Sequence, residues 1–278
     1  MKLEKIWAVY FSGTGTTRRT VERIAGGIAS QLNLPAESVD FSHPAVRQET
    51  LGFGEKDLVV FGTPVYAGRV PNVLLPFLRE RVVGGGALAV PVVLFGNRNY
   101  DDALIELRNI LAADGMHPIA AGAFVGEHSF SRVLGADRPN AEDETLMDEF
   151  AARVAELAAG LDAAPVKSAA VRGQEPLRPY YTPRDRAGNP INILKVKPKT
   201  DLSRCGGCGL CADLCPMGSI DPTDVSAVRG ICIKCCACVK GCPTGAKFFD
   251  DAGYLYHQHE LEAQYARPAE NEVFYIQL

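Results

Sequence analysis

Residues 5–17 read KIWAVYFSGTGTT, and this stretch decides the fold of the first part of the chain. Lys5–Phe11 is a short run of apolar, largely β-branched and aromatic residues, which predicts a buried strand. Lys2 and Lys5 precede the apolar residues Ile6–Phe11, as in a secretion signal, but these residues are few and no small-residue cleavage site follows. A turn of glycines and hydroxyls then leads into Thr17–Leu32, where apolar side chains recur at helical spacing. The stretch therefore predicts a strand, a tight turn and a helix.

The same alternation continues to residue 161. Further strands are expected at Ser38–Phe41, Asp57–Gly62, Ala87–Gly96 and Pro118–Val125, and further helices at Val73–Val82, Ala103–Ala113 and Glu142–Leu161. Pro91 lies inside an expected strand and predicts a bulge, because proline has no backbone N–H to donate. Strands that alternate with helices pair in parallel and are covered on both faces. We expect an α/β fold with a doubly wound, five-stranded parallel sheet.

Composition indicates a soluble protein. The chain has 278 residues, of which 47% are hydrophobic and 22% charged. The sequence holds no apolar run of the ~18 residues needed to cross a bilayer. We therefore expect a cytoplasmic protein that binds no membrane.

The distribution of charge differs between segments of the second half of the chain. Residues 166–199 carry 8 basic and 2 acidic side chains, whereas residues 251–278 carry 1 and 5. The basic segment lacks interleaved aromatics and a recognisable nucleic-acid-binding module, so we expect no nucleic-acid partner. It is expected either to lie across acidic surface of the protein itself or to receive an acidic partner.

Six prolines between positions 165 and 198 rule out a long helix there. We therefore predict four parts: an α/β domain at 1–161, a proline-rich connector at 162–200, a cysteine-rich domain at 201–250 and a tail at 251–278. The end of the tail, NEVFYIQL (271–278), predicts a strand that pairs with a sheet edge or covers a seam between the domains.

The first turn is a candidate phosphate loop. It consists of Ser12, Gly13, Thr14, Gly15, Thr16 and Thr17. It is not a Walker loop, and Arg18 stands where a dinucleotide fingerprint has its third glycine. Backbone N–H groups, hydroxyls and a helix N-terminus together suit a terminal phosphate. A plain Gly/Thr turn is the alternative.

Two later loops follow the third and fourth strands, and both emerge at the same carboxyl edge as the first loop. They read GTPVYAGRVP (62–71) and GNRNYDD (96–102). Each carries an aromatic residue, Tyr66 or Tyr100, that is able to cover a flat ring.

With these three loops, residues 1–160 resemble a flavodoxin domain, whose sheet also has five strands. The resemblance implies FMN, with its phosphate in the first loop and its ring between the other two. The ring-flanking residues would be Thr63, Pro64, Val65, Tyr66, Ala67 and Gly68 in one loop, and Gly96, Asn97, Arg98, Asn99 and Tyr100 in the other. Tyr-Ala-Gly-Arg replaces the bulky stacking residue common in simple flavodoxins, so which ring face Tyr66 or Tyr100 covers is open.

Three side chains near these loops are candidate catalytic residues. Arg69 and Arg98 are either solvated surface arginines or cations that stabilise a reduced flavin or hold an acidic substrate. His128, at the end of the fifth strand, is either a proton-transfer group or an ordinary loop histidine. His257 and His259 in the tail lack a further ligand nearby and do not predict a metal site.

All nine cysteines lie between positions 205 and 242. The two arrays are Cys205, Cys208, Cys211 and Cys215-Pro216, and then Cys232, Cys235, Cys238 and Cys242-Pro243. This CxxCxxCxxxCP run is the bacterial ferredoxin pattern, in which the fourth cysteine ligates the other cluster. One 4Fe–4S cluster is thus predicted on Cys205, Cys208, Cys211 and Cys242, and a second on Cys232, Cys235, Cys238 and Cys215. Zinc is the less favoured alternative.

The ninth cysteine, Cys236, is not needed as a ligand. Its counterpart in the first array is Gly209, which suggests that the position requires a small residue. Cys236 is therefore predicted to be a small apolar filler, with a redox-labile thiol or a substitute ligand as alternatives.

Residues 201–249 resemble a two-cluster ferredoxin, and nearly the whole chain is similar to the flavodoxin–ferredoxin fusion family. We expect an electron-transfer oxidoreductase of an anaerobe or facultative anaerobe that exchanges electrons with a redox protein partner. One alternative is an FMN-dependent reductase of a small substrate, with the clusters as its donor. Another is a redox-responsive regulator, which would require a hinge in the connector.

Overall fold

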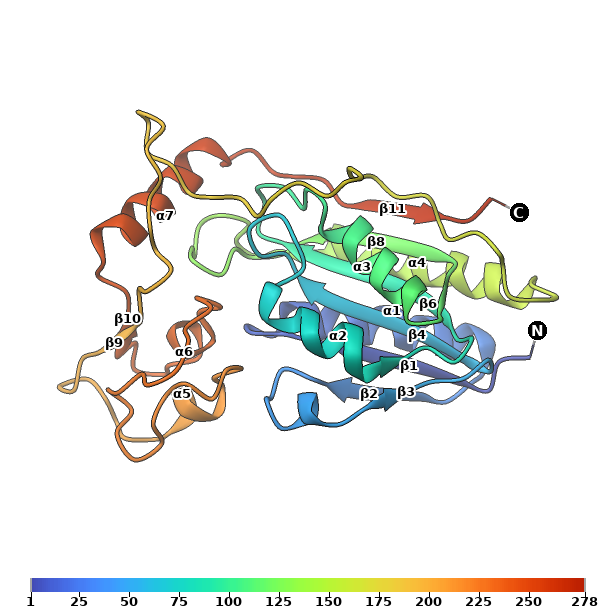
Figure 1. The fold of residues 1–278 in the computed structure, drawn as a ribbon, viewed down its shortest axis with the longest axis horizontal. Coiled ribbons are helices and arrows are strands. Elements are labelled where there is room, and N and C mark those ends of the chain that lie inside the picture. The colour runs from blue at the N-terminus through green and yellow to red at the C-terminus, as the bar shows by residue number, and fades with distance from the viewer. Residues whose placement is uncertain (1, 278) are drawn as a thin grey trace.

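The computed structural model describes residues 2–277 and has two lobes (Figure 1). The larger lobe is an α/β sheet domain, and the smaller is the cysteine-rich part. The smaller lobe lies beyond the end of the sheet to which the loops after the parallel strands lead. The described chain begins and ends at the opposite end of the larger lobe.

The larger lobe is built on one mixed sheet, in the order β11-β8-β6-β4-β1-β2, with β7 paired to β6. Its strands are β1 (Lys5–Tyr10), β2 (Ala36–Asp40), β4 (Asp57–Pro64), β6 (Leu88–Phe95), β7 (His117–Pro118), β8 (Ala120–Val125) and β11 (Glu272–Tyr275). A small separate pair joins β3 (Leu51–Gly52) and β5 (Val82–Val83). The five long parallel strands have the flavodoxin order 2-1-3-4-5, which confirms the predicted fold class.

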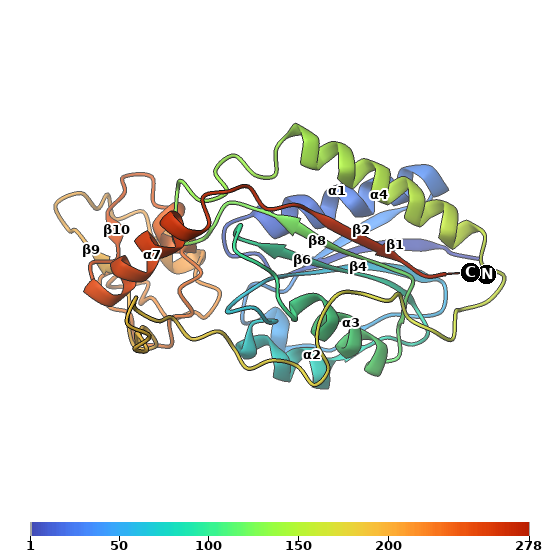
Figure 2. The same ribbon diagram turned by 90° about the horizontal axis from the view of Figure 1, so that it is seen from above.

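Helices cover both faces of this sheet (Figure 2). They are α1 (Thr16–Leu32) and α4 (Ala141–Ala159) on one face, and α2 (Leu75–Arg81) and α3 (Ala103–Ala113) on the other. Strand alternation divides the core accordingly. Ile6 and Ala8 pack with α1 and α4, whereas Val9 packs with α2 and α3.

Pro91 marks a bulge, as predicted. On one side of β6 the pairing with β4 is continuous through Pro91. On the other side, Ala89 pairs with Pro118, 29 residues later, whereas Val92 pairs with Gly122, 30 residues later. One extra residue therefore lies in the neighbouring strand next to the proline, where β7 ends and β8 begins.

The connector lies across acidic groups of the protein itself, which was one of the two expected roles. Its arginines pair with carboxylates of the sheet domain and the tail. The pairs are Arg172–Glu272 at 2.8 Å, Arg178 with Asp102, and Arg186–Glu260 at 2.9 Å. A connector anchored at three places does not favour the hinge that a redox-responsive regulator would require.

The tail contains a helix that the sequence did not predict, α7 (Ala252–Gln264), followed by the predicted edge strand. β11 pairs antiparallel with β8, with Glu272 opposite Ala123 and Tyr275 opposite Ala120. Leu278 of the predicted strand lies outside the described residues. The tail thus runs from the small lobe back along the large one (Figure 1).

The cysteine-rich lobe contains two similar halves. Each half has one short helix, α5 (Leu210–Asp213) or α6 (Ala237–Lys240), and β9 (Lys199–Thr200) pairs antiparallel with β10 (Lys247–Phe248). Both helices begin after a residue in the left-handed conformation, Gly209 or Cys236. Within residues 2–277, no helix is long and apolar enough to span a membrane.

Candidate functional site

The first loop leaves the start of α1 without a side-chain cap. Gly15 precedes the helix with a φ of 87°, and the first turn carries no acidic residue. The Ser12 Oγ accepts a hydrogen bond from the Arg18 N–H at 3.2 Å, and the Ser12 N–H donates to Ser42 Oγ at 2.7 Å. The hydroxyls of Ser12 and Ser42 thus shape the loop, and its helix N-terminus is of the kind that suits a phosphate.

The three predicted loops meet at one cavity. Its walls comprise Gly13, Thr14, Thr16 and Thr17 of the first loop, Pro64–Tyr66 of the second, Leu94–Gly96 at the end of β6, and Gly126–Ser129 after β8. This wall combines a glycine and three hydroxyl groups of the first loop with the aromatic ring of Tyr66. The residues present therefore fit FMN, whose phosphate would lie against the N-terminus of α1.

Tyr66 is the aromatic residue beside this site. A two-residue turn follows it, with Ala67 at φ 52° and Gly68 at φ 77°. Tyr66 and Arg69 exchange two backbone hydrogen bonds of 3.0 and 3.1 Å across the turn. A Cβ at Gly68 would lie 2.3 Å from Asp101 Oδ2, so glycine is required both for the turn and for the close approach.

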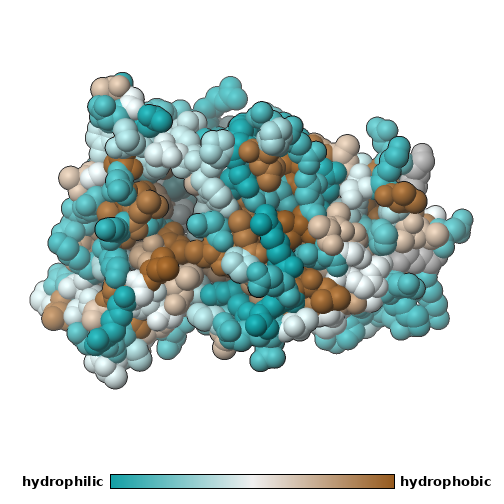
Figure 3. All heavy atoms as spheres, in the orientation of Figure 1, coloured by the Kyte–Doolittle hydropathy of each residue, from teal (hydrophilic) through white to brown (hydrophobic). Residues whose placement is uncertain are grey.

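A larger cavity of about 220 Å³ adjoins the first and lies between the two lobes. Tyr66, Arg98 and His128 line it on the side of the sheet domain. Apolar residues of the connector, the cysteine-rich lobe and α7 close it: Ile193, Leu194, Ile233 and Leu261. Figure 3 shows apolar residues gathered where the small lobe meets the large one.

His128 is held in its neutral form. Burial, together with repulsion from Lys240, His257 and Arg98, lowers its pKa to about 3. Its Nδ1 accepts a hydrogen bond from the Phe130 N–H at 3.1 Å, so the proton of the neutral ring is on Nε2. Near pH 7 the ring is a neutral N–H donor beside the cavity, which does not favour a role as a proton reservoir.

Arg98 lines the larger cavity, as expected of a cation near the ring. Its guanidinium pairs with Asp101 and lies 4.6 Å from the centre of the Tyr181 ring. His257 lines the same cavity, and burial lowers its pKa to about 4, helped by the charge of Arg98. His259 is exposed, so the two tail histidines do not converge on one point.

Arg69 is placed elsewhere. It makes a two-pronged ion pair with buried Glu106, with both N–O distances at 2.7 Å, and lies over the ring of Tyr180. It also donates to the backbone oxygen of Arg178 in the connector. The expected position beside the flavin is therefore not the observed one, because a buried carboxylate and the connector together hold this side chain.

Tyr100 also lies away from the cavities. It is 1% exposed, packs on Phe95 and donates its hydroxyl hydrogen to Glu272 Oε2 at 2.7 Å. Of the two aromatics proposed to cover a flat ring, only Tyr66 lies at the site. Tyr100 instead ties the loop after β6 to the tail.

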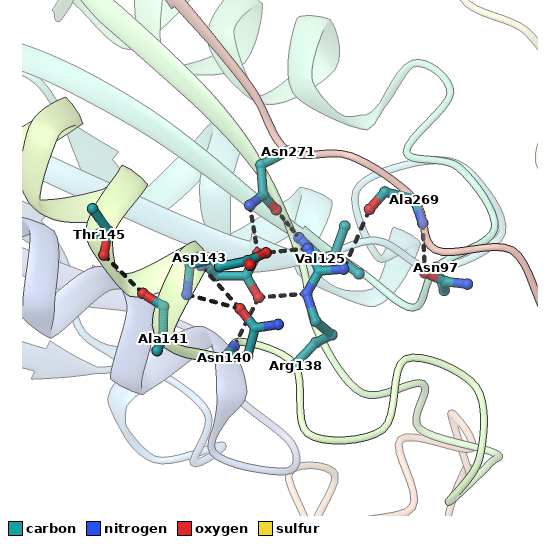
Figure 4. Close-up of polar contacts among 10 residues, drawn as sticks. Asn97, Val125, Arg138, Asn140, Ala141, Asp143, Thr145, Ala269 and Asn271 are labelled. Atoms are coloured by element: carbon teal, nitrogen blue, oxygen red, sulfur yellow. Dashed lines mark hydrogen bonds and ion pairs between the residues drawn. The ribbon is translucent and has the colours of Figure 1, made fainter.

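Asn97 binds the tail as well. Its amide nitrogen donates to the backbone oxygens of Tyr265 and Arg267. Its amide oxygen accepts from the Ala269 N–H at 2.9 Å (Figure 4). Beside it, Asn271 bridges the Val125 N–H and Asp143, at 2.8 and 2.6 Å. These contacts hold the tail against the loops that form the site.

The eight predicted ligands line two separate cavities, grouped in the crossed arrangement that was predicted. Cys205, Cys208, Cys211 and Cys242 line the first, which we call the outer cage. Cys215, Cys232, Cys235 and Cys238 line the second, the inner cage, and Cys236 lines it as well. All nine thiols are free of disulfides. Among the described residues no group of three or more His, Cys, Asp or Glu is placed to hold a metal ion. The doubled spacing of the cysteines is the ground for preferring a cluster to zinc.

The inner cage lies directly against the phosphate loop. A Cβ at Gly13 would lie 3.0 Å from Cys235 Cβ, and Cys235 lines the narrower flavin cavity. In the outer cage, by contrast, Cys208 is exposed. The inner cage is therefore the one beside the flavin site.

Two cations hold the lobes together, and sequence reasoning missed both. Lys240 of α6 donates to Glu127 and to the backbone oxygens of His128 and Ser131, at 2.7 and 2.9 Å. Arg47 donates to Phe41 O, Ser42 O and, across the interface, Pro216 O. The only sequence signal was the place of Lys240 between Cys238 and Cys242, two predicted ligands of different clusters.

Comparisons with known proteins agree with both halves. Residues 8–105 match a family described as flavodoxin domain, and residues 198–221 match one described as 4Fe-4S binding domain. Among curated proteins, none matches the sequence.

Several solved structures resemble the larger lobe. A flavodoxin from the domain Archaea is 18% identical with a TM-score of 0.42, covering 55% of this chain and 97% of its own. An apo NADH:FMN oxidoreductase is 16% identical with a TM-score of 0.38, covering 56% and 89%. The rubredoxin oxygen:oxidoreductase of Desulfovibrio gigas is 14% identical with a TM-score of 0.35, covering 58% of this chain and 38% of its own. Likenesses this distant say nothing about activity.

Proposed function

We propose that this chain, a flavodoxin domain followed by a 4Fe–4S binding domain, transfers electrons between two 4Fe–4S clusters and FMN. The observation that carries the proposal is the contact of Cys235 in the inner cage with Gly13 in the phosphate loop. FMN can take two electrons in single steps, whereas each cluster exchanges one. A chain that joins them can collect electrons singly and deliver them as a pair.

The order of the cages supports a direction for the path. The inner cage is walled by apolar residues and its Cys235 and Cys238 are buried. The outer cage has an exposed ligand, Cys208, with Leu210 and Leu214 partly exposed nearby in sequence. We therefore place the redox protein partner at the outer cage and the flavin at the inner one.

Side chains of the protein hold the inner cage in a fixed position against the flavin site. Lys240 fixes α6 to the loop after β8, and Arg47 fixes the loop after β2 to Pro216 next to Cys215. The tail covers the seam with α7 and is held by Asn97 and Asn271. Such fixed contacts preserve the separation on which electron transfer between two centres depends.

Anaerobic purification with iron, sulfide and flavin analysis tests the proposal. Two clusters and one flavin require about eight irons and about one FMN per chain. Photoreduction should then reduce the clusters and the flavin in the same molecule, seen as separate absorbance changes. About four irons, or no FMN, would contradict it.

A second candidate function has an observation in its favour. The 220 Å³ cavity beside Arg98 and His128 offers space for a small molecule next to the flavin ring, as an FMN-dependent reductase would need. Under steady illumination with a photoreductant, such an enzyme should reduce a small acceptor at a rate that saturates and that falls in Arg98→Ala. A reduction rate that rises linearly with acceptor concentration, and that is the same in wild type and in Arg98→Ala, indicates an electron carrier instead.

A further inference from the structure

Lys247 is a buried lysine in the wall of the outer cage. It is 3% exposed and lines the cavity together with Cys205, Cys208, Cys211 and Cys242. Its amino group donates to the backbone oxygen of Val225, and among the described residues no carboxylate forms an ion pair with it. Lysine is almost never this buried unless its charge is paired, because removing an ammonium group from water is costly. The balancing charge therefore belongs in the cage itself.

The inner cage lacks this charge. The segment after Cys242 reads PTGAK and the equivalent segment after Cys215 reads PMGSI, so Ile220 is the counterpart of Lys247. Ile220 is 4% exposed and lines the inner cage. Both residues occupy matching places in the backbone, since Lys247 pairs with Thr200 and Ile220 with Val228. At this position the two cages thus differ by one buried positive charge. The lysine nearest the inner ligands in sequence, Lys234, is only partly buried and donates to the backbone oxygens of Leu194 and Cys232, at 3.1 and 2.9 Å.

Backbone hydrogen bonds to the crossing cysteines are alike in the two cages. Cys242 Sγ accepts from the Ala246 N–H at 3.2 Å, and Cys215 Sγ accepts from the Ser219 N–H at 3.3 Å. The buried ammonium group of Lys247 is therefore what makes the outer cage the better environment for negative charge.

We infer that Lys247 makes the two clusters electrically unequal: it compensates negative charge in the outer cage and raises the reduction potential of that cluster above that of the inner one. Reduction adds one electron to a cluster whose four thiolates are already negative, so a nearby cation stabilises the reduced state more than the oxidised one. The inference rests on the proposed function only in taking both cages to hold clusters.

This asymmetry gives the two clusters different tasks. An electron that a partner delivers to the outer cluster remains on that cluster, because it is the easier of the two to reduce. The inner cluster, in its apolar wall beside the flavin site, holds an electron less strongly and passes it on. Lys247 thus determines which of the two clusters is reduced first.

The test is a potentiometric titration of the purified holoprotein, followed by electron paramagnetic resonance, for wild type and for Lys247→Met. Methionine keeps the length and the burial of the side chain and removes its charge. One of the two cluster potentials should fall enough to change the reduced-to-oxidised ratio at least tenfold at a given applied potential, which is 59 mV for a one-electron couple. The other should move less.

Two further variants separate charge from packing. Lys247→Arg keeps the charge and should keep the wild-type potential, while Ile220→Met makes an uncharged change in the inner cage and should leave both potentials in place. If Lys247→Met loses a cluster while Lys247→Arg keeps it, the inference is still supported. If both variants lose the cluster, the inference is overturned.

Iron analysis separates the two proposals. A wild-type protein with about four irons per chain contradicts the two-cluster function. About eight irons in Lys247→Met with both potentials unchanged overturns the role of Lys247 alone.

Discussion

Cys236 occupies a backbone position that favours glycine. Its φ is 59°, and the equivalent residue of the first array, Gly209, has a φ of 74°. Each precedes a short helix that carries cluster ligands. The sequence suggested that a small residue is needed for space near the cluster, but the structure adds a conformational reason, since the left-handed region is costly for residues with a Cβ. Cys236 compensates with a contact of its Sγ to the Tyr254 hydroxyl, at 3.4 Å.

Replacing Cys236 by alanine should leave iron and sulfide content unchanged, because the ferredoxin pattern supplies four other cysteines to each cluster. Cys236→Gly is the matched variant: it relieves about 1–2 kcal/mol of left-handed strain while losing the same contact, so it should be more stable than Cys236→Ala. Iron analysis and thermal unfolding measure both effects. Loss of about four irons from the alanine variant would make Cys236 a ligand after all.

Arg69 is predicted to matter for stability rather than for the flavin. Arg69→Met leaves the carboxylate of Glu106, 1% exposed, without its cation and should cost about 3–5 kcal/mol in the free energy of unfolding. Arg98→Met removes a residue that lines the cavity and should shift the flavin potential instead. Urea unfolding and flavin potentiometry on both variants give the comparison. A shifted flavin potential in Arg69→Met with unchanged stability would reverse the assignment.

At the scale of elements, periodicity predicted the long strands and helices of the sheet domain within a few residues. Their apolar patterns are long, and burial on both faces leaves little choice of register. α7 was missed because its apolar residues are few: Tyr254, His257 and Leu261 are buried, and two of them are polar at one end. The helix α7 is buried only because the small lobe and the sheet domain pack against it. A local sequence pattern carries no information about such packing.

β11 depends on the side chains that anchor it. Asn271→Ala removes the acceptor for the Val125 N–H and a donor to Asp143, and leaving buried groups unpaired costs about 1–3 kcal/mol each. We expect faster hydrogen exchange along β8 and β11, with β1 and β4 unchanged. Thr145→Ala is the control, because the Thr145 hydroxyl bonds only its own helix, at Ala141 O (Figure 4). Equal exchange in the two variants would show that Asn271 does not hold the tail.

At the scale of the whole molecule, Lys240 should control electron transfer between the lobes. Lys240→Met removes three donor contacts to the loop after β8 and leaves Glu127 without its cation. We expect unchanged iron and FMN content but slower electron transfer from cluster to flavin after flash photoreduction.

Lys199→Met is the matched control, since Lys199 forms an exposed pair with Asp250 inside the small lobe. Such pairs contribute about 0–1 kcal/mol, so its rate should equal that of the wild type. A wild-type rate in Lys240→Met would mean that other contacts suffice to hold the lobes.

The candidate site could be predicted where its chemistry lies within one motif. Spacing identified the crossed cysteines and the phosphate loop, because helices and turns fix such neighbours locally. It could not place Arg69, Tyr100 or Asn97, each of which bonds a partner distant in sequence: Glu106, Glu272 and the backbone of the tail. The contact of Gly13 with Cys235 joins residues from opposite ends of the chain and follows from docking alone.

The pairing of β11 with β8 also protects the protein from association with other chains. Without β11 the edge of β8 would be uncovered, and an open strand edge invites such pairing. The contacts of Asn97 and Asn271 that hold the tail therefore also guard the sheet against aggregation.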